Sequence, residues 1–255
     1  MRLAVAGKGG SGKSVLSGTL ARILARRGHK VLALDSDTLE GLAFSLGATV
    51  PDVPLLLAAA ERGEDDRWRF VRGVGPVRAV QRYSTAAPDG VRLLQVGKTT
   101  NNGQGPVMAA TQAFHKVIHG LDCARTFDDW VVLGDLCAGP RQAAYDWAPY
   151  ARRILLVVEP TRQSMMTARR VRTIAAQTRP GTEFSLVVNK AARAEDPDAI
   201  AAFLDLNPLG VVPVDDAVRA SERLGVALID HAPHAPAMAA IERVADALER
   251  STVEP

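Results

Sequence analysis

The stretch 3-LAVAGKGGSGKSVLSGTLARILARRGHKVLALDSD-37 carries the pattern that decides the fold. It begins with an apolar run, passes through a glycine-rich loop, and continues with Leu16, Leu20, Ile23 and Leu24 at helical spacing. The loop fits the form G-x-x-x-x-G-K-[ST]. An apolar strand, this loop and an amphipathic helix in that order predict a phosphate-binding loop at the junction of a strand and a helix.

The loop 7-GKGGSGKS-14 meets the physical demands of phosphate binding. Glycines let the backbone turn and bring its N–H groups close to phosphate oxygens, and the start of the next helix adds partial positive charge. In this pattern Lys13 reaches the β- and γ-phosphates, and the Ser14 hydroxyl ligates Mg²⁺. The residues expected to bind the nucleotide here are Gly7, Gly9, Gly10, Ser11, Gly12, Lys13, Ser14 and Val15.

Further apolar runs predict the other strands of one sheet. Most are apolar throughout rather than alternating, which is typical of strands covered on both faces, and helical patterns lie between them. The alternation favours a single α/β domain over 1–255, with a doubly wound, mostly parallel sheet and helices on both faces, as in P-loop NTPases. The strands are expected at 2–6, 31–35, 91–97, 130–135, 153–159, 184–189 and 209–213. The helices are expected at 14–27, with Gly28 as its cap, and near 106–120, 162–177, 197–204, 216–224 and 236–250.

Residues 51–90 break this alternation. They carry charges of both signs in 61-ERGEDDRWRFVR-72, followed by a stretch that contains glycine and proline. We interpret 51–90 as an insertion between two core units. Its arginines either face a partner or form a solvated surface, and the pattern of mixed charge favours the second interpretation.

The composition narrows the class of protein. A length of 255 residues with 47% apolar and 23% charged residues suits one large globular α/β domain. The start resembles no signal peptide and no apolar run reaches a membrane span, so a cytoplasmic location is expected. A net charge of +3 is too small to indicate nucleic-acid binding, and the mixed charges of the last helix argue against membrane attachment. Cys123 and Cys137 are too few for a disulfide framework or a four-ligand metal site in one subunit.

Lys8 is not explained by phosphate binding, because Lys13 already occupies the phosphate position. Lys8 is either a solvated charge or a group that acts across a dimer interface. The pattern G-K-G-G-x-G-K-[ST] resembles the deviant Walker A loop of the MinD/ParA/nitrogenase iron-protein superfamily, whose early lysine crosses to the phosphates of the other subunit. The resemblance implies ATP with Mg²⁺, a homodimer in the ATP state, and catalytic roles for Lys8 and Lys13.

Two aspartates follow the second strand in 34-LDSDT-38. By the same resemblance Asp37 is the catalytic aspartate that orients the attacking water, and Asp35 contacts Mg²⁺ through water. Thr38 stands where the superfamily usually has proline. An Asx-type cap on the next helix is the alternative for both aspartates, and their position at a strand end favours the functional interpretation.

The segment 131-VVLGDLCAGP-140 resembles the D-x-x-x-G second switch of the superfamily. The resemblance assigns Asp135 to Mg²⁺ through water and makes Asp37, Asp135 and Gly139 switch residues. A carboxylate at a strand end can bind a water of a Mg²⁺ ion, and a glycine can turn its amide toward the γ-phosphate.

The expected base-binding residues lie in the second half of the chain. Asn189 and Lys190 resemble the N-K element of the superfamily, whose asparagine reads adenine, although a buried capping asparagine is the alternative. Pro213, Val214 and Asp215 resemble the loop that closes over the base.

Within the superfamily the chain resembles the CooC-type ATPases, which are associated with nickel insertion into carbon monoxide dehydrogenase. The run 158-VEPTRQSMMTA-168 carries this narrower resemblance. That branch has a metal-binding Cys-x-Cys, expected here near 101–111, where the sequence has no cysteine. The iron-protein branch needs two cysteines per subunit, and only Cys137 lies near either position. Because thiolates select soft metals, neither metal role carries over.

These resemblances lead to three ranked hypotheses. The first is an Mg-ATP-dependent dimerising ATPase that acts as a nucleotide switch in the maturation or assembly of a client protein of unknown identity. The second is a positioning or partitioning ATPase of the ParA/MinD kind. The third is a reductase like the nitrogenase iron protein.

Overall fold

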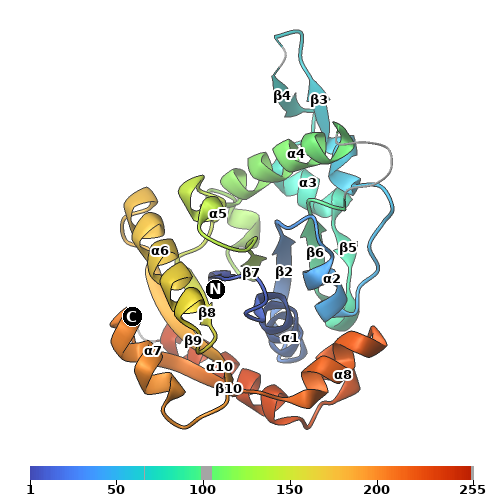
Figure 1. Cartoon of the computed structure of the whole chain (residues 1–255). Coiled ribbons are helices and arrows are strands. Elements are labelled where there is room, and N and C mark those ends of the chain that lie inside the picture. Colours follow the sequence, from blue (N-terminus) through green and yellow to red (C-terminus); the bar gives the residue numbers. More distant parts are fainter. Residues whose placement is uncertain (66, 99–104, 254–255) are drawn as a thin grey trace.

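The computed structural model of the chain describes residues 1–65, 67–98 and 105–253. Its central sheet has eight strands in the order β10-β9-β8-β1-β7-β2-β6-β5 (Figure 1). Every neighbouring pair is parallel except β5 with β6. The predicted mostly parallel sheet is therefore confirmed. The strands are β1 (Arg2–Gly7), β2 (Lys30–Asp35), β5 (Thr85–Ala86), β6 (Arg92–Gln95), β7 (Trp130–Asp135), β8 (Arg153–Val158), β9 (Glu183–Ala191) and β10 (Pro208–Pro213).

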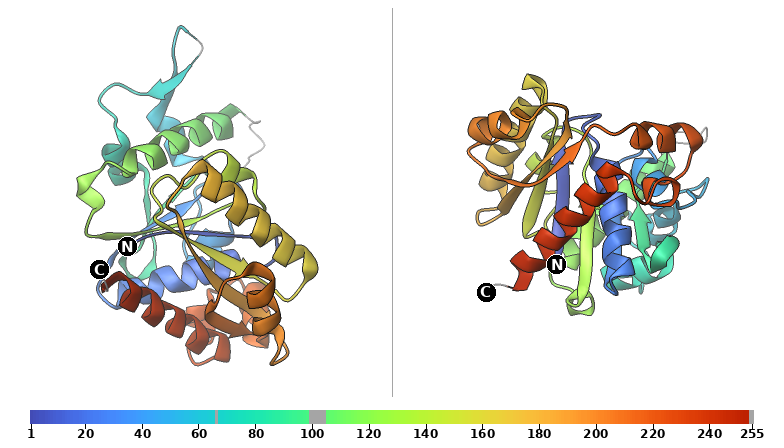
Figure 2. Two further views of the ribbon diagram at one scale, coloured as in Figure 1. Left: turned by 90° about the vertical axis from the view of Figure 1, so that its left-hand side faces the viewer. Right: turned by 90° about the horizontal axis from the view of Figure 1, so that it is seen from below.

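Two layers of helices cover the two faces of the sheet (Figure 2). Along β1, Ala4 and Ala6 face one hydrophobic core, whereas Leu3 and Val5 face the other. The first core is closed by α4, α6 and α7, and the second by α1, α2 and α10. Since both faces are buried, the strands carry apolar residues at nearly every position, and this is the pattern that the sequence shows.

All six predicted helices are present, together with α3, which lies within 51–90, and three shorter helices that the sequence did not reveal. The short helices α2, α5 and α9 have six, four and four residues, too few turns to produce a periodic apolar pattern. None of the helices in the described part of the chain has the length and apolar character that a membrane crossing requires. The helices are α1 (Lys13–Arg26), α2 (Gly41–Leu46), α3 (Pro76–Tyr83), α4 (Gly105–Leu121), α5 (Arg141–Ala144), α6 (Arg162–Thr178), α7 (Asp196–Leu204), α8 (Asp216–Leu224), α9 (Leu228–His231) and α10 (Pro236–Val253).

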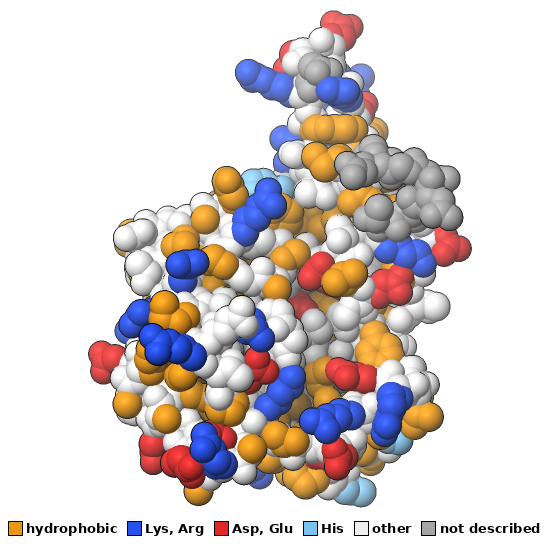
Figure 3. Space-filling model, in the orientation of Figure 1, with side chains coloured by type: hydrophobic (Ala, Val, Ile, Leu, Met, Phe, Trp, Pro, Cys, Tyr) orange, Lys and Arg blue, Asp and Glu red, His pale blue; other side chains and the backbone are white. Residues whose placement is uncertain are grey.

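Part of the segment 51–90 packs into the hydrophobic core, and part of it projects from the body of the protein. The hairpin of β3 (Ala60–Arg62) and β4 (Trp68–Phe70) pairs only with itself and stands out from the body (Figure 1). Side chains of both charges cover its outer part (Figure 3). The rest of the segment contributes buried residues such as Leu56 and Val80 to the first core. The interpretation of 51–90 as an insertion stays a prediction.

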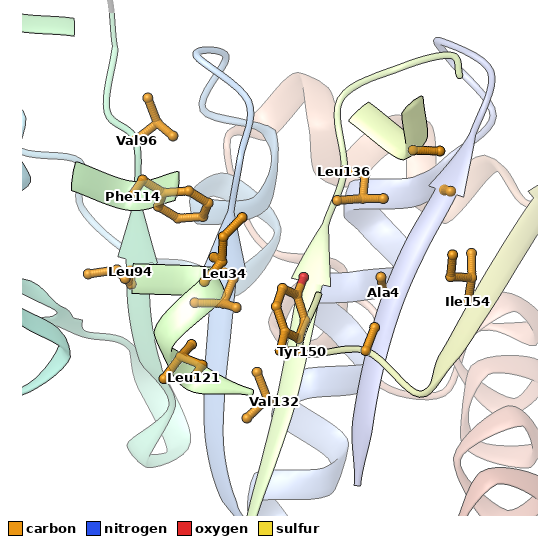
Figure 4. Close-up of a cluster of buried hydrophobic side chains, with 14 of the residues drawn as sticks. Ala4, Leu34, Leu94, Val96, Phe114, Leu121, Val132, Leu136, Tyr150 and Ile154 are labelled. Atoms are coloured by element: carbon orange, nitrogen blue, oxygen red, sulfur yellow. The ribbon is translucent and has the colours of Figure 1, made fainter. Parts of the chain in front are cut away.

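Tyr150 is the largest of the fully buried side chains and packs over the middle of the sheet (Figure 4). Its ring lies against β7 at Gly134, where an added Cβ would come 1.6 Å from the Tyr150 Oη. Burial, and then the nearby Asp135 carboxylate, raise the pKa of Tyr150 well above its usual value. Gly134 therefore provides the space that Tyr150 occupies.

A charged cluster ties α1 to the loops around it. The Arg22 side chain is 3% exposed, and its Nε donates to Asp89 Oδ2 at 2.6 Å. Its two terminal nitrogens hold both carboxylate oxygens of Asp230. Partial burial alone would raise the pKa of Asp89, but hydrogen bonds from Arg22 and Arg26 outweigh it and lower that pKa. The cluster joins three segments that lie far apart in the sequence.

We expect Asp89→Asn to destabilise the protein at neutral pH by about 1–3 kcal/mol, because Arg22 loses a charged partner. Asparagine tolerates the left-handed backbone of this position, where φ is 60°. Because the folded-state pKa is lowered from 3.8, the stabilisation is present above that pH and is lost as pH falls through the lowered value. Urea unfolding of both proteins from pH 7 to pH 2 measures the difference.

Asp129→Asn is the matched control, since Asp129 pairs with Lys30 where both side chains are 62% exposed. It should change stability much less. If the free energies of unfolding of Asp89→Asn and the wild type differ by the same amount at pH 7 and at pH 2, the ionised Asp89 carboxylate does not stabilise the protein.

Candidate functional site

The loop from β1 to α1 forms a backbone cradle at the carboxyl edge of the sheet. Gly10 and Gly12 have φ of 78° and 89°, in the left-handed region that favours glycine. A Cβ on Gly7 would come 2.4 Å from the Val157 carbonyl oxygen, so the loop must begin with glycine. The carbonyl of Lys8 accepts the Ser11 N–H at 3.2 Å. These turns are of the kind that aims backbone amides at an anion.

A cavity of about 410 Å³ extends from this loop to α8 and has the size of a small-molecule site. The lining residues that were not expected from the sequence include Phe44 on α2, and Arg219 and Glu222 on α8. No motif marks these three, because the approach of their helices to the loop is a tertiary feature. Of the expected residues, those that line the cavity are Gly10, Gly12, Lys13, Ser14, Val15, Asn189, Lys190, Pro213, Val214 and Asp215.

Two buried carboxylates lie together beside the loop. Asp35 and Asp135 are partners in the parallel register of β2 and β7, and they are 1% and 3% exposed. The Ser14 hydroxyl donates to Asp135 Oδ2 at 2.6 Å, and the Ser17 hydroxyl donates to Oδ1 at 3.2 Å. Ser17 was missed in the sequence, although it lies one turn after Ser14 on the same helix.

The electrostatics of this pair suit a cation. Burial, and then the charge of Asp135, raise the pKa of Asp35 well above its usual value. Burial also raises the pKa of Asp135 to about 6, although the hydrogen bond from Ser14 and the charge of Lys13 oppose it. A divalent cation beside both groups would favour their charged forms. A hydroxyl and two carboxylates are the oxygen donors that Mg²⁺ prefers, so this set of side chains fits that ion.

Asp37 and Gly139 lie in the loops that follow Asp35 and Asp135. None of these four residues is among the described residues that line the cavity. The half-buried Asp37 donates its N–H to Asp35 Oδ1 at 3.1 Å, and its own Oδ1 accepts the Leu39 N–H at 3.2 Å. These are Asx-type turns within the loop, but neither aspartate caps the next helix, because the N-cap of α2 is Glu40 and no side chain caps it. The Gly139 N–H donates to the Gly7 carbonyl at 3.0 Å, which ties its loop to the cradle.

Lys8 is engaged within its own chain. Its Nζ lies 3.0 Å from Glu159 Oε1, with the two side chains 28% and 14% exposed. Lys190 Nζ lies 3.7 Å from the other oxygen of Glu159 and donates to the Gly10 carbonyl. Glu159 was not predicted, although an acidic residue that ends an apolar strand is the signal that supported the assignment of Asp35 and Asp135.

Asn189 and Asp215 hold backbone around the cavity. The Asn189 Nδ2 donates to the Ser11 carbonyl at 2.7 Å. Asp215 accepts the Ala217 N–H at 2.9 Å with one oxygen and the Ala237 N–H at 2.8 Å with the other. These bonds cap α8 and tie it to the start of α10. Asp215 therefore shapes the wall of the cavity through its contacts with backbone.

The two cysteines do not form a metal site in the structure. Burial, and then the charges of Asp37 and Asp35, raise the pKa of the Cys137 thiol to about 12, so it stays protonated. Cys123 is exposed. Across the described ranges, no three His, Cys, Asp or Glu side chains are arranged to hold a metal ion. The Cys-x-Cys of the CooC-type branch was expected near 101–111, and the first part of that range, 101–104, lies outside the described residues.

Comparisons of sequence relate this chain to known proteins. A family model described as the CobQ/CobB/MinD/ParA nucleotide binding domain matches residues 3–229. The chain is 30% identical over 240 residues to an uncharacterised ATP-binding protein of Methanocaldococcus jannaschii, covering 88% of this chain and 90% of that protein. It is 28% identical over 267 residues to the carbon monoxide dehydrogenase accessory protein CooC of Rhodospirillum rubrum, with coverage of 96% and 97%.

Solved structures share the fold along nearly the whole chain. The septum site-determining protein MinD of Pyrococcus horikoshii, complexed with Mg-ADP, superposes with a TM-score of 0.75 at 20% identity, covering 99% of this chain and 97% of that one. The cell division ATPase MinD of Pyrococcus furiosus gives 0.73 at 22% identity, covering 98% and 99%. At these identities the likeness concerns the fold.

Proposed function

Because this chain belongs to the CobQ/CobB/MinD/ParA family of nucleotide-binding domains, we propose that it is an Mg²⁺-dependent ATPase that forms a homodimer in its ATP state. The observation that carries the proposal is the hydrogen bond from the Ser14 hydroxyl, at the loop end of the cavity, to Asp135, which is one of two buried carboxylates paired in register. That pair supplies oxygen ligands for a cation at the point where the loop would hold the phosphates.

Each residue of the site has its own role in the proposed hydrolysis. The loop amides and Lys13 hold and neutralise the phosphates. Ser14, with Asp35 and Asp135 through water, would hold Mg²⁺, which when bound neutralises negative charge on the phosphate oxygens. Asp37 orients the attacking water. Gly139 would have to leave the Gly7 carbonyl before its amide could donate to a phosphate.

Lys8 gives the site its dependence on a second subunit. In the single chain its charge is neutralised by Glu159, at 3.0 Å. To reach the nucleotide of a second subunit, Lys8 must exchange this carboxylate for phosphate oxygens. A triphosphate offers more negative charge than a diphosphate, so ATP favours the exchange more than ADP does.

We further propose that the nucleotide cycle drives the maturation or assembly of a client protein. Similarity to the CooC accessory protein over 96% of this chain supports this role. A ParA/MinD-like positioning role is the second candidate, which rests on structures at about 20% identity. A reductase role has no thiolate pair among the described residues to support it. The cytoplasmic location stays a prediction.

The test compares wild type with Lys8→Ala. We expect wild type to hydrolyse Mg-ATP and to sediment as a dimer with a slowly hydrolysed ATP analogue. Lys8→Ala should bind ATP within about threefold of wild type, because Lys13 remains, and should lose hydrolysis roughly 100-fold or more together with dimerisation. Lys116→Ala, an exposed lysine on α4, is the matched control and should behave as wild type. A Lys8→Ala protein that still dimerises and hydrolyses would overturn the trans role of Lys8.

A further inference from the structure

The side chain of Gln142 joins the two loops that follow β2 and β7, and the mechanism above gives it no role. Gln142 lies on α5 and is 8% exposed. Its Oε1 accepts the Cys137 N–H at 2.8 Å and lies 2.8 Å from the Ser36 Oγ. Its Nε2 donates to the Ser36 carbonyl and to the Cys137 Sγ, both at 3.2 Å. Both ends of one amide group thus bond to both loops.

The two loops also meet directly at these residues. The Cys137 Sγ donates to the Ser36 carbonyl at 3.2 Å. The Ser36 hydroxyl lies 2.7 Å from the Asp135 carbonyl and can give its one proton either to that oxygen or to Gln142. The Ser36 N–H faces the same Asp135 carbonyl at 3.3 Å. The network is compact and polar, and at its centre is the buried Gln142 amide.

Both loops carry residues on which the proposed hydrolysis depends. Ser36 directly precedes Asp37, and Cys137 lies two residues before Gly139. Gln142 itself follows Gly139 by three residues, so a movement of Gly139 toward a phosphate displaces the start of α5. Through its bonds to Ser36, Gln142 would carry this movement to the backbone that holds Asp37.

We propose that Gln142 is a positioning residue that couples the two loops, so that Asp37 reaches its hydrolytic position only when the loop of Gly139 has moved. The proposal rests on the proposed ATPase function. A neutral amide suits this place because Asp35, Asp37 and Asp135 are close by and a carboxylate would be repelled. An apolar side chain of the same length would remove the hydrogen bonds that the Ser36 carbonyl and the Cys137 N–H make with the Gln142 amide group.

The test variant is Gln142→Met, which keeps the length and removes the hydrogen bonds. In the nucleotide-free protein we expect hydrogen exchange to rise about tenfold at the amides of 36–39 and 137–139 together. In steady-state assays we expect kcat to fall roughly 10–100-fold with KM within about threefold, because Asp37 is misplaced while the phosphate loop is intact. Gln177→Met, on the exposed far end of α6, is the matched control and should change neither measurement.

A second variant tests whether Gln142 acts through its hydrogen bonds to the loop of Ser36 or only by filling space. Ser36→Ala removes one partner of Gln142, and the double variant should lose little more kcat than the more damaging single variant. If Gln142→Met is insoluble, Gln142→Asn, which is too short to span both loops, replaces it with the same expectations. Unchanged exchange in both loops, or additive losses of kcat, would overturn the proposal. A wild type without ATPase activity would refute the proposed function, whereas the exchange data would still show whether Gln142 ties the loops.

Discussion

The Gly134→Ala variant is expected to lose roughly 3 kcal/mol or more of its free energy of unfolding. The added Cβ would lie 1.6 Å from the Oη and 2.8 Å from the Cζ of Tyr150. The ring is 1% exposed and enclosed by core side chains (Figure 4), so it has no free space to move into. Either β7 or the ring must shift, and β7 ends in Asp135, so the site is disturbed as well.

Chemical denaturation of purified variants measures this loss. Tyr150→Phe in the Gly134→Ala background removes the atom with the worst contact and should recover part of the stability, because the Cζ contact remains. Gly75→Ala is the control: its φ is −118°, and its Cβ would meet nothing within 4 Å. A Gly134→Ala protein within about 1 kcal/mol of wild type would show that the core adapts and that this packing is not required.

The Gly12→Ala variant is expected to weaken ATP binding roughly 100-fold or more. Its φ of 89° is strained for alanine, and its Cβ would lie 2.2 Å from the Asn189 Nδ2. Asn189 would then have to release the Ser11 carbonyl, to which it donates at 2.7 Å. Both changes displace the amides that the loop must aim at phosphate, so the loss exceeds that of a single hydrogen bond.

Equilibrium titration with a fluorescent ATP analogue measures the affinity, and thermal unfolding shows whether the variant is folded. Gly28→Ala carries the same backbone penalty, with φ of 93°, but its Cβ would meet nothing within 4 Å at the far end of α1. It should bind ATP as wild type does. If Gly12→Ala binds ATP within threefold of wild type, the cradle is not the phosphate site.

The strands were predicted well because their signal is local. A strand covered on both faces must be apolar at nearly every position, and this is visible in any short window of the sequence. The hairpin of β3 and β4 lacks that signal because it lies outside the central sheet and none of its strand residues is fully buried. The antiparallel edge strand β5 has only two residues, which is too short for any pattern.

The acidic part of the site was assigned by resemblance to the superfamily, and the position of the aspartates at strand ends supported the assignment. In a parallel sheet, carboxylates that end neighbouring strands meet at one edge, and Asp35 and Asp135 do so in register. The same rule would have found Glu159. No local rule finds Gln142, because a glutamine on a helix of four residues looks like any polar surface residue until its neighbours are known.

The sequence by itself determined the fold class and marked the glycine-rich loop with its two lysines as the expected phosphate site, because each depends on residues that are adjacent along the chain. The tertiary structure alone decided how the site is connected. Lys8 meets Glu159 across 151 positions, and Gln142 meets Ser36 across 106. These pairings depend on the order of the strands, with β1 between β8 and β7, and β7 between β1 and β2. A hydrogen bond requires its atoms to be placed within a few tenths of an ångström, and only the packed sheet and helices provide that placement.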